Sequence, residues 1–122
     1  KAQLASKAGA DHTIIYTEQE FDQEAKRLTD GAGVQVVYDS VGMTTFDKSI
    51  ASLAHRGCLV LYGQASGAVP PVSTATLRNN GSLFLTRSVR GDYTATPEEL
   101  LLRAEDVMKW VDISEVLRDG VL

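Results

Sequence analysis

The chain has 122 residues, a net charge of −4 and 43% hydrophobic residues, an ordinary composition for a single globular domain with a modest core. Acidic residues outnumber basic ones, 16 to 12, which argues against a nucleic-acid surface because phosphate backbones select clustered Lys and Arg. No apolar run reaches the roughly 18 residues of a membrane span, so no membrane association is expected.

The single cysteine, Cys58, cannot form an internal disulfide, and its apolar neighbours favour a buried, reduced thiol and a cytoplasmic location. His12 and His55 have no companions at metal-ligand spacing, so no metal site is expected. The chain begins at Lys1 rather than Met, which suggests that an N-terminal part is missing.

The first part of the chain predicts two helices around a short strand. Alanine and leucine spacing predicts a helix over 1–8, and a β-branched run predicts a strand over 13–16. Thr17 and Glu20 have the spacing of a capping box and predict a helix that ends at Asp30.

The middle of the chain is organised around segment 34–42, whose β-branched run predicts a strand buried on both faces that delivers Asp39 and Ser40 to the edge of a parallel sheet. Residues 44–56 predict an amphipathic helix whose last turn holds the second histidine. Residues 58–62 predict another buried strand.

The remaining elements repeat this alternation. A short helix is predicted over 73–78, a strand over 82–87 and the start of one more strand over 113–122. Thr96 and Pro97 predict a helix N-terminus. That helix has a wide apolar face, expected to be buried, made of Leu100, Leu101, Ala104, Val107, Met108 and Val111. The order of elements predicts an α/β fold with a mostly parallel sheet.

The predicted strand ends carry small, hydroxyl or amide residues, among them Ser40, Gly63, Gln64 and Thr86. Such residues let a flat ligand lie against the backbone and bond to ribose or carboxamide groups, although they also serve as plain turn formers. The sequence contains no glycine-rich phosphate loop, nucleophile elbow or Cys-x-x-Cys pair. Hydrolytic and zinc chemistries therefore lack their usual residues.

Four sequence blocks carry a family resemblance. They are GADH at 9–12, VVYDSVG at 36–42, YGQASG at 62–67 and GSLFLTR at 81–87. In this order and spacing they resemble the quinone oxidoreductase (zeta-crystallin) branch of the zinc-independent medium-chain dehydrogenase/reductase family. The resemblance implies a partial Rossmann-type domain that lacks its first two strands, NADPH as hydride donor, quinones or related conjugated carbonyls as acceptors, and a homodimer.

The resemblance also implies a cofactor site. Lys1 matches the lysine that contacts the adenosine 2′-phosphate, and Tyr16 matches the tyrosine packed near the same group. Ser40 and Val41 match the turn on the adenosine side of the crevice. The stretch near the nicotinamide ribose and carboxamide is matched by Tyr62, Gly63 and Gln64. The catalytic residues are expected to lie outside this chain.

Under this resemblance, residues 1–112 are expected to form part of a dinucleotide-binding domain, and 113–122 to begin the segment that returns to a catalytic domain. The strand over 82–87 would be the dimer edge, and open sheet edges would favour self-association. Two alternatives remain open: an enoyl reductase of the same superfamily, or a non-catalytic fragment that binds nucleotide or dimerises.

Overall fold

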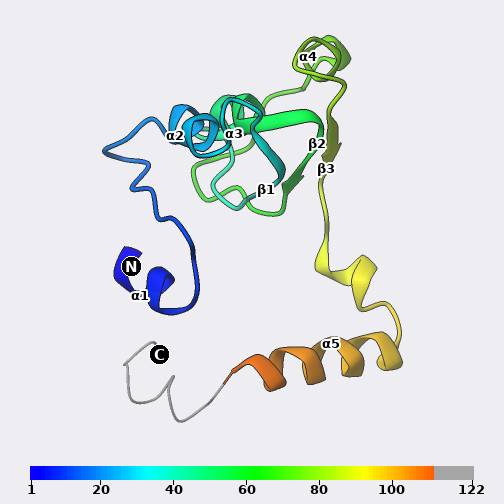
Figure 1. Ribbon diagram of the computed structural model, residues 1–122. Helices are drawn as coiled ribbons and strands as arrows, with labels where there is room; N and C mark the ends of the chain where they lie inside the picture. Colours follow the sequence, from blue (N-terminus) through cyan, green and yellow to red (C-terminus); the bar gives the residue numbers. More distant parts are fainter. Residues whose placement is uncertain (112–122) are drawn as a thin grey trace. The chain divides into compact units, whose positions relative to one another are not determined.

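The computed structural model describes residues 1–111 (Figure 1). These residues divide into two compact units, the first covering Lys1–Arg87 and the second beginning at Ser88. The strand predicted over 113–122, and with it the second segment of the predicted domain division, lies outside the described residues. None of the helices between residues 1 and 111 has the length and hydropathy needed to cross a bilayer.

The first unit is built on a three-stranded parallel sheet with the order β1-β2-β3. Its strands are β1 (Val34–Asp39), β2 (Leu53–Leu61) and β3 (Phe84–Thr86). The central strand pairs Leu59 with Val37 on one side and with Leu85 on the other. The predicted α/β fold with a parallel sheet is therefore confirmed.

Four helices belong to this unit: α1 (Ala2–Lys7), α2 (Phe21–Leu28), α3 (Phe46–Ser52) and α4 (Thr74–Asn79). α3 packs against β1 and β2, and α2 lies beside α3 (Figure 1). The core forms where α3 meets the sheet, and its buried members are Phe46, Ile50, Leu53, Leu59 and Leu83. The apolar stripe predicted on the helix after residue 44 accordingly faces the core.

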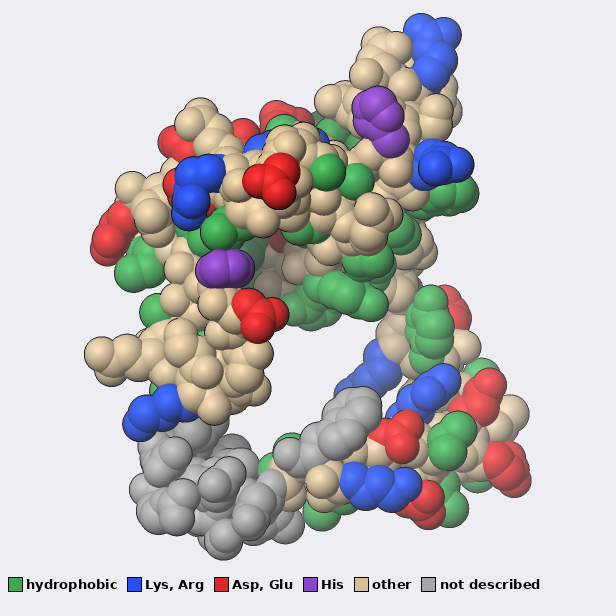
Figure 2. Space-filling model, viewed as in Figure 1, with side chains coloured by type: hydrophobic (Ala, Val, Ile, Leu, Met, Phe, Trp, Pro, Cys, Tyr) green, Lys and Arg blue, Asp and Glu red, His purple; other side chains and the backbone are tan. Residues whose placement is uncertain are grey.

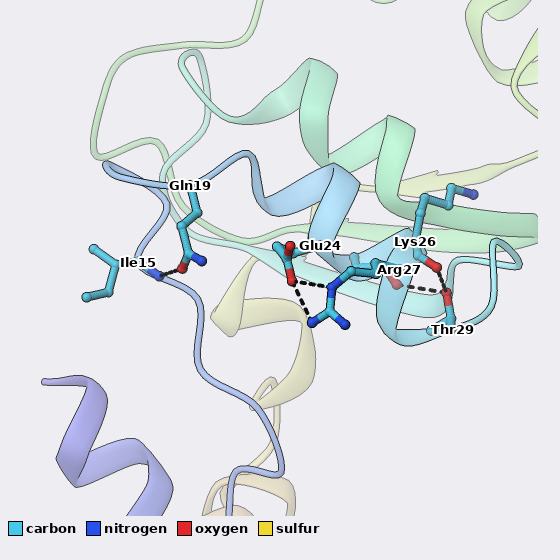
Figure 3. A network of polar contacts seen from close by, with 7 residues as sticks. Ile15, Gln19, Glu24, Lys26, Arg27 and Thr29 are labelled. Carbon is cyan, nitrogen blue, oxygen red and sulfur yellow. Dashed lines mark hydrogen bonds and ion pairs between the residues drawn. The ribbon is translucent and has the colours of Figure 1, made fainter.

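Polar contacts fasten α2 at its C-terminal end (Figure 3). Arg27 forms an ion pair with Glu24 at 2.9 Å, and the Thr29 hydroxyl donates to the Lys26 carbonyl at 3.2 Å. The Lys26 ammonium donates to the Leu53 carbonyl at 2.9 Å. The Lys26 bond thereby joins α2 to Leu53, the first residue of β2.

The strand predicted over 13–16 is not formed. These residues have no regular secondary structure and pair with none of the strands described between residues 1 and 111. β-branched residues favour extended backbone, but a strand also needs a neighbour for its N–H and C=O groups. Ile15 and Tyr16 are consequently exposed.

Two predicted helix boundaries are wrong. α2 begins at Phe21 with Glu20 as its cap and no side-chain capping bond, so the predicted capping box is absent there. α3 ends at Ser52, because Leu53 adopts an extended conformation and pairs with Val34. His55 therefore lies in β2 rather than in the last turn of a helix.

The prediction that β1 is buried on both faces is wrong in this structure. Side chains alternate along the strand, so Val37 packs against the core while Val36 and Tyr38 point to the opposite face. These two side chains are 44% and 72% exposed. β1 is also an edge strand of the described sheet. Its apolar sequence is typical of a strand with neighbours on more sides than are present here.

The second unit contains the 3₁₀ helix η1 (Arg90–Tyr93) and α5 (Pro97–Trp110). Thr96 caps α5 in a reciprocal box with Glu99, which confirms the predicted N-terminus. The apolar face of α5 is exposed, contrary to prediction, with Leu101 61% and Met108 57% accessible. Apolar side chains reach the surface of this helix between charged ones (Figure 2). The described part of this unit offers no further layer to cover them.

Candidate functional site

The carboxyl ends of β1 and β2 are joined by backbone hydrogen bonds. The Asp39 carbonyl accepts from the Tyr62 N–H at 2.9 Å and from the Gly63 N–H at 3.3 Å, and the Ser40 carbonyl accepts from Ala65 at 3.2 Å. A Cβ on Gly63 would lie 2.3 Å from the Ser40 carbonyl oxygen. Only glycine permits this approach, which brings two predicted site segments together.

Ser66 joins the loops that follow these two strands. Its hydroxyl donates to the Val41 carbonyl at 2.8 Å and accepts from the Thr44 N–H at 3.0 Å. The Ser66 N–H also donates to the Val41 carbonyl at 2.8 Å. The turn containing Val41 is therefore held by a neighbouring loop as well as by its own strand.

The buried Asp39 side chain holds the turn that contains Val41 and Gly42. Asp39 is 5% exposed. Its carboxylate accepts from the Val41 N–H at 2.8 Å, the Gly42 N–H at 3.0 Å, and the hydroxyls of Thr45 and Ser49, each at 2.8 Å. Burial by itself would raise the pKa of Asp39, but these hydrogen bonds outweigh it and the pKa is lowered. The carboxylate therefore stays charged and holds the turn through these four donors.

Three of the predicted residues meet in one cavity beside β1. Tyr16, Ser40 and Val41 line a space of about 300 Å³ at the carboxyl end of the strand. Phe21 and Ile14 add apolar side chains to its lining, and Thr45 and Ser49 add hydroxyl groups. A small apolar cavity with a few hydroxyl groups has the composition of a small-molecule site.

A second cavity adjoins the first through shared residues. It has a volume of about 460 Å³ and is lined by Lys1, His12 and residues of α1. Ile14 and Tyr16 line both cavities. Lys1 and Tyr16, both predicted to lie near the adenosine 2′-phosphate, therefore line the same cavity. An ammonium and a phenol hydroxyl can both donate hydrogen bonds to an anion there.

Tyr62, Gly63 and Gln64 lie outside these two cavities. They follow β2 directly, and the Tyr62 side chain is 53% exposed. The N–H groups of Tyr62 and Gly63 nevertheless donate to the carbonyl of Asp39, one residue before Ser40. Of the seven predicted cofactor residues, Lys1, Tyr16, Ser40 and Val41 line the two cavities. The other three, at 62–64, form a neighbouring turn outside them.

A third cavity contains none of the predicted site residues. It has a volume of about 320 Å³ and is lined by Met43, Phe46, Val72 and Thr76 together with the proline loop at 70–71. It lies on the side of the turn that faces α4. Because its lining has no cation, it is a poorer match for a phosphorylated ligand.

The sequence reasoning missed two contributors to this site. The first is the pair of hydroxyls, Thr45 and Ser49, that hold the Asp39 carboxylate. Their four-residue spacing puts them on one helical face, which was the available signal. The second is Arg87, whose guanidinium donates to the Leu61 carbonyl at 3.1 Å.

Within residues 1–111, no three His, Cys, Asp or Glu side chains lie close enough together to hold a metal ion.

Comparison with known sequences gives consistent matches. Residues 1–108 match the model of the family described as zinc-binding dehydrogenase. The chain is 40% identical over 116 residues to the quinone oxidoreductase of Pseudomonas aeruginosa, which covers 95% of this chain and 36% of that protein. It is 42% identical over 101 residues to the 2-haloacrylate reductase of a Burkholderia species, covering 82% of this chain and 30% of that protein.

Solved structures agree with the sequence matches. A mycobacterial protein solved in complex with NADPH has a TM-score of 0.83 and 49% identity, over 89% of this chain and 34% of that one. Escherichia coli quinone oxidoreductase, also solved with NADPH, has a TM-score of 0.83 and 38% identity, over 99% and 35%. The α/β fold is therefore that of the Rossmann-like domain in these proteins.

The chain spans about a third of the length of the relatives it matches, 36% and 37% for two of the quinone oxidoreductases. Within that span the match runs through nearly every described element, from α1 to α5. The chain belongs to the zinc-binding dehydrogenase family, and its similarity within that family is to the quinone oxidoreductases.

Proposed function

We propose that this chain supplies the NADPH-binding domain of an oxidoreductase that reduces quinones or related conjugated carbonyls by hydride transfer. One observation carries the proposal: Lys1, Tyr16, Ser40 and Val41 line two adjoining cavities at the carboxyl end of β1. Ligands of open α/β sheets bind at this end of the strands. The NADPH complexes of similar proteins support the same cofactor.

The described residues fit the adenosine end of NADPH. Lys1 supplies a cation and Tyr16 a hydroxyl for the 2′-phosphate, the group that distinguishes NADPH from NADH. Ser40 and Val41 lie beyond Tyr16 in the adjoining cavity, where they would border the adenosine. The buried Asp39 holds their backbone in place through the Val41 and Gly42 N–H groups.

The turn at 62–64 would border the nicotinamide end. NADPH supplies the hydride, and the protein's task is to orient the ring and limit its movement. Gly63 allows the backbone to pack closely against Ser40, and Gln64 offers an amide beside it. We assign no catalytic acid or base in this chain.

Calorimetric titration with NADPH and NADH tests the proposal. We expect NADPH to bind at least about tenfold more tightly, since one charge-assisted hydrogen bond is worth about 1.5–3 kcal/mol. Lys1→Met should remove this preference. Lys7→Met is the matched control, because Lys7 is an exposed lysine at the other end of α1 and does not line the cavity. Equal binding of both nucleotides, or binding of neither, would contradict the proposal.

A second acceptor class is favoured by one specific match. The 2-haloacrylate reductase relative is named for a conjugated acid, so conjugated acids are an alternative to quinones. Enoyl thioesters are the alternative that the sequence analysis left open. An acceptor panel on the complete enzyme carrying this domain separates them, with 1,4-benzoquinone, 2-chloroacrylate and crotonyl-coenzyme A compared by kcat/KM. We expect the quinone to be preferred. A higher kcat/KM for 2-chloroacrylate would shift the assignment to the alternative.

We further propose that two copies associate through the free edge of β3 and act in the cytoplasm. β3 is an edge strand of the described sheet, Phe84 on it is 63% exposed, and Cys58 is a free thiol. Sedimentation velocity should give a dimer that Phe84→Lys weakens, because a charge on an edge strand discourages pairing. A wild-type monomer at all concentrations would contradict the dimer.

A further inference from the structure

Arg87 stands at the point where the β2–β3 ladder stops. The register pairs Val60 with Thr86, the last residue of β3. Leu61 is the last residue of β2, and Arg87 follows β3 directly. Beyond the Val60–Thr86 pair, a side chain supplies the hydrogen bond between the two segments: the Arg87 Nη1 atom donates to the Leu61 carbonyl at 3.1 Å. A charge-assisted bond to a partly buried carbonyl is stronger than a neutral one.

The same peptide group is held on its other side by β1. The Leu61 carbonyl and the Tyr62 N–H belong to one planar unit, and the Tyr62 N–H donates to the Asp39 carbonyl at 2.9 Å. The Leu61 side chain is itself buried, at 5% exposure. Both polar atoms of this peptide are therefore bonded, one toward each neighbouring strand, and its orientation is fixed.

From these contacts we infer that Arg87 is a positioning residue for the turn at 62–64, and so sets the affinity for the nicotinamide half of the cofactor. The inference rests on the proposed function of that turn. The fixed peptide immediately precedes Tyr62, Gly63 and Gln64, so its orientation sets the direction in which they leave the sheet. Without the guanidinium, the Leu61 carbonyl loses a charged donor on the β3 side, and the peptide rotates more freely about its bond to Asp39.

The test compares two ligands that share only the adenosine end. NADPH spans both halves of the site, whereas adenosine 2′,5′-bisphosphate needs only the cavities lined by Lys1, Tyr16, Ser40 and Val41. Arg87→Ala should weaken NADPH binding about tenfold, the effect of losing one hydrogen bond of about 1.4 kcal/mol. Binding of the bisphosphate should stay within about twofold. Equal loss for both ligands, or for neither, would overturn the inference.

Two variants and one further measurement sharpen the test. Arg87→Lys keeps a charged donor and should recover most of the NADPH affinity, while Arg78→Ala, on the exposed end of α4, should change neither affinity. Hydrogen exchange of the Tyr62 amide should accelerate in Arg87→Ala without any ligand. Failure of the wild-type chain to bind NADPH would refute the proposed function, whereas unchanged Tyr62 exchange would refute the role of Arg87.

Discussion

The Asp39 carboxylate accepts a hydrogen bond from the Ser49 hydroxyl at 2.8 Å, across ten residues of sequence. This contact joins the end of β1 to α3, and the Thr45 hydroxyl makes a second contact to the same carboxylate. The turn that borders the first cavity is thus built on a buried charge. Its shape depends on the hydrogen bonds to that charge.

Asp39→Asn should destabilise the chain by about 2 kcal/mol, because an amide cannot accept all four of the present hydrogen bonds and leaves buried donors unpaired. Urea unfolding followed by circular dichroism measures the change. Asp11→Asn makes the same chemical change at an exposed residue and should cost less than about 0.5 kcal/mol. Equal effects for the two variants would contradict the structural role of Asp39.

The contribution of Asp39 should also depend on pH. Its pKa is lowered in the folded chain below the ordinary value of 3.8, so its stabilising effect is fully present above that value. The effect is lost as the pH falls through the folded pKa. The difference in unfolding free energy between wild type and Asp39→Asn should therefore shrink from pH 6 to pH 3. A difference that stayed constant over this range would be inconsistent with a lowered pKa.

Gly63→Ala should disturb both stability and cofactor binding. The added Cβ would lie 2.3 Å from the Ser40 carbonyl oxygen and 2.8 Å from its Cα, so two backbone segments must separate. We expect the free energy of unfolding to fall by about 2 kcal/mol, which is typical of overpacking, and NADPH binding to weaken. Gly91→Ala, where a Cβ meets no atom within 4 Å, is the control and should leave both unchanged. An alanine tolerated at both positions would argue against the close contact.

The parts of the fold that local sequence determines were predicted well. The strand at 34–39, the helix start at Thr96 and the alternation of elements follow from β-branched runs, caps and turn residues. The strand expected over 13–16 failed for a different reason, because its formation depends on a partner that local sequence does not supply. The exposed face of α5 is a similar case, since burial is a property of neighbouring layers.

The candidate site was predicted in outline rather than in detail. The family resemblance identified Tyr16, Ser40 and Val41, which the structure gathers in one cavity. It could not identify the bond from Arg87 to Leu61, which arises from strand register and not from any local pattern. The same holds for the turn at 62–64, whose packing against Ser40 depends on how two strand ends meet.

The most direct test of the central claim is a set of ¹H–¹⁵N correlation spectra of the chain during titration with NADPH. The account predicts saturable shifts of the Tyr16, Ser40 and Val41 amides, which line the first cavity. The signals of the Val72 and Thr76 amides, which line the third cavity, should not shift. Shifts confined to that third cavity, or no shifts at millimolar NADPH, would contradict the assignment of the cofactor to this end of the sheet.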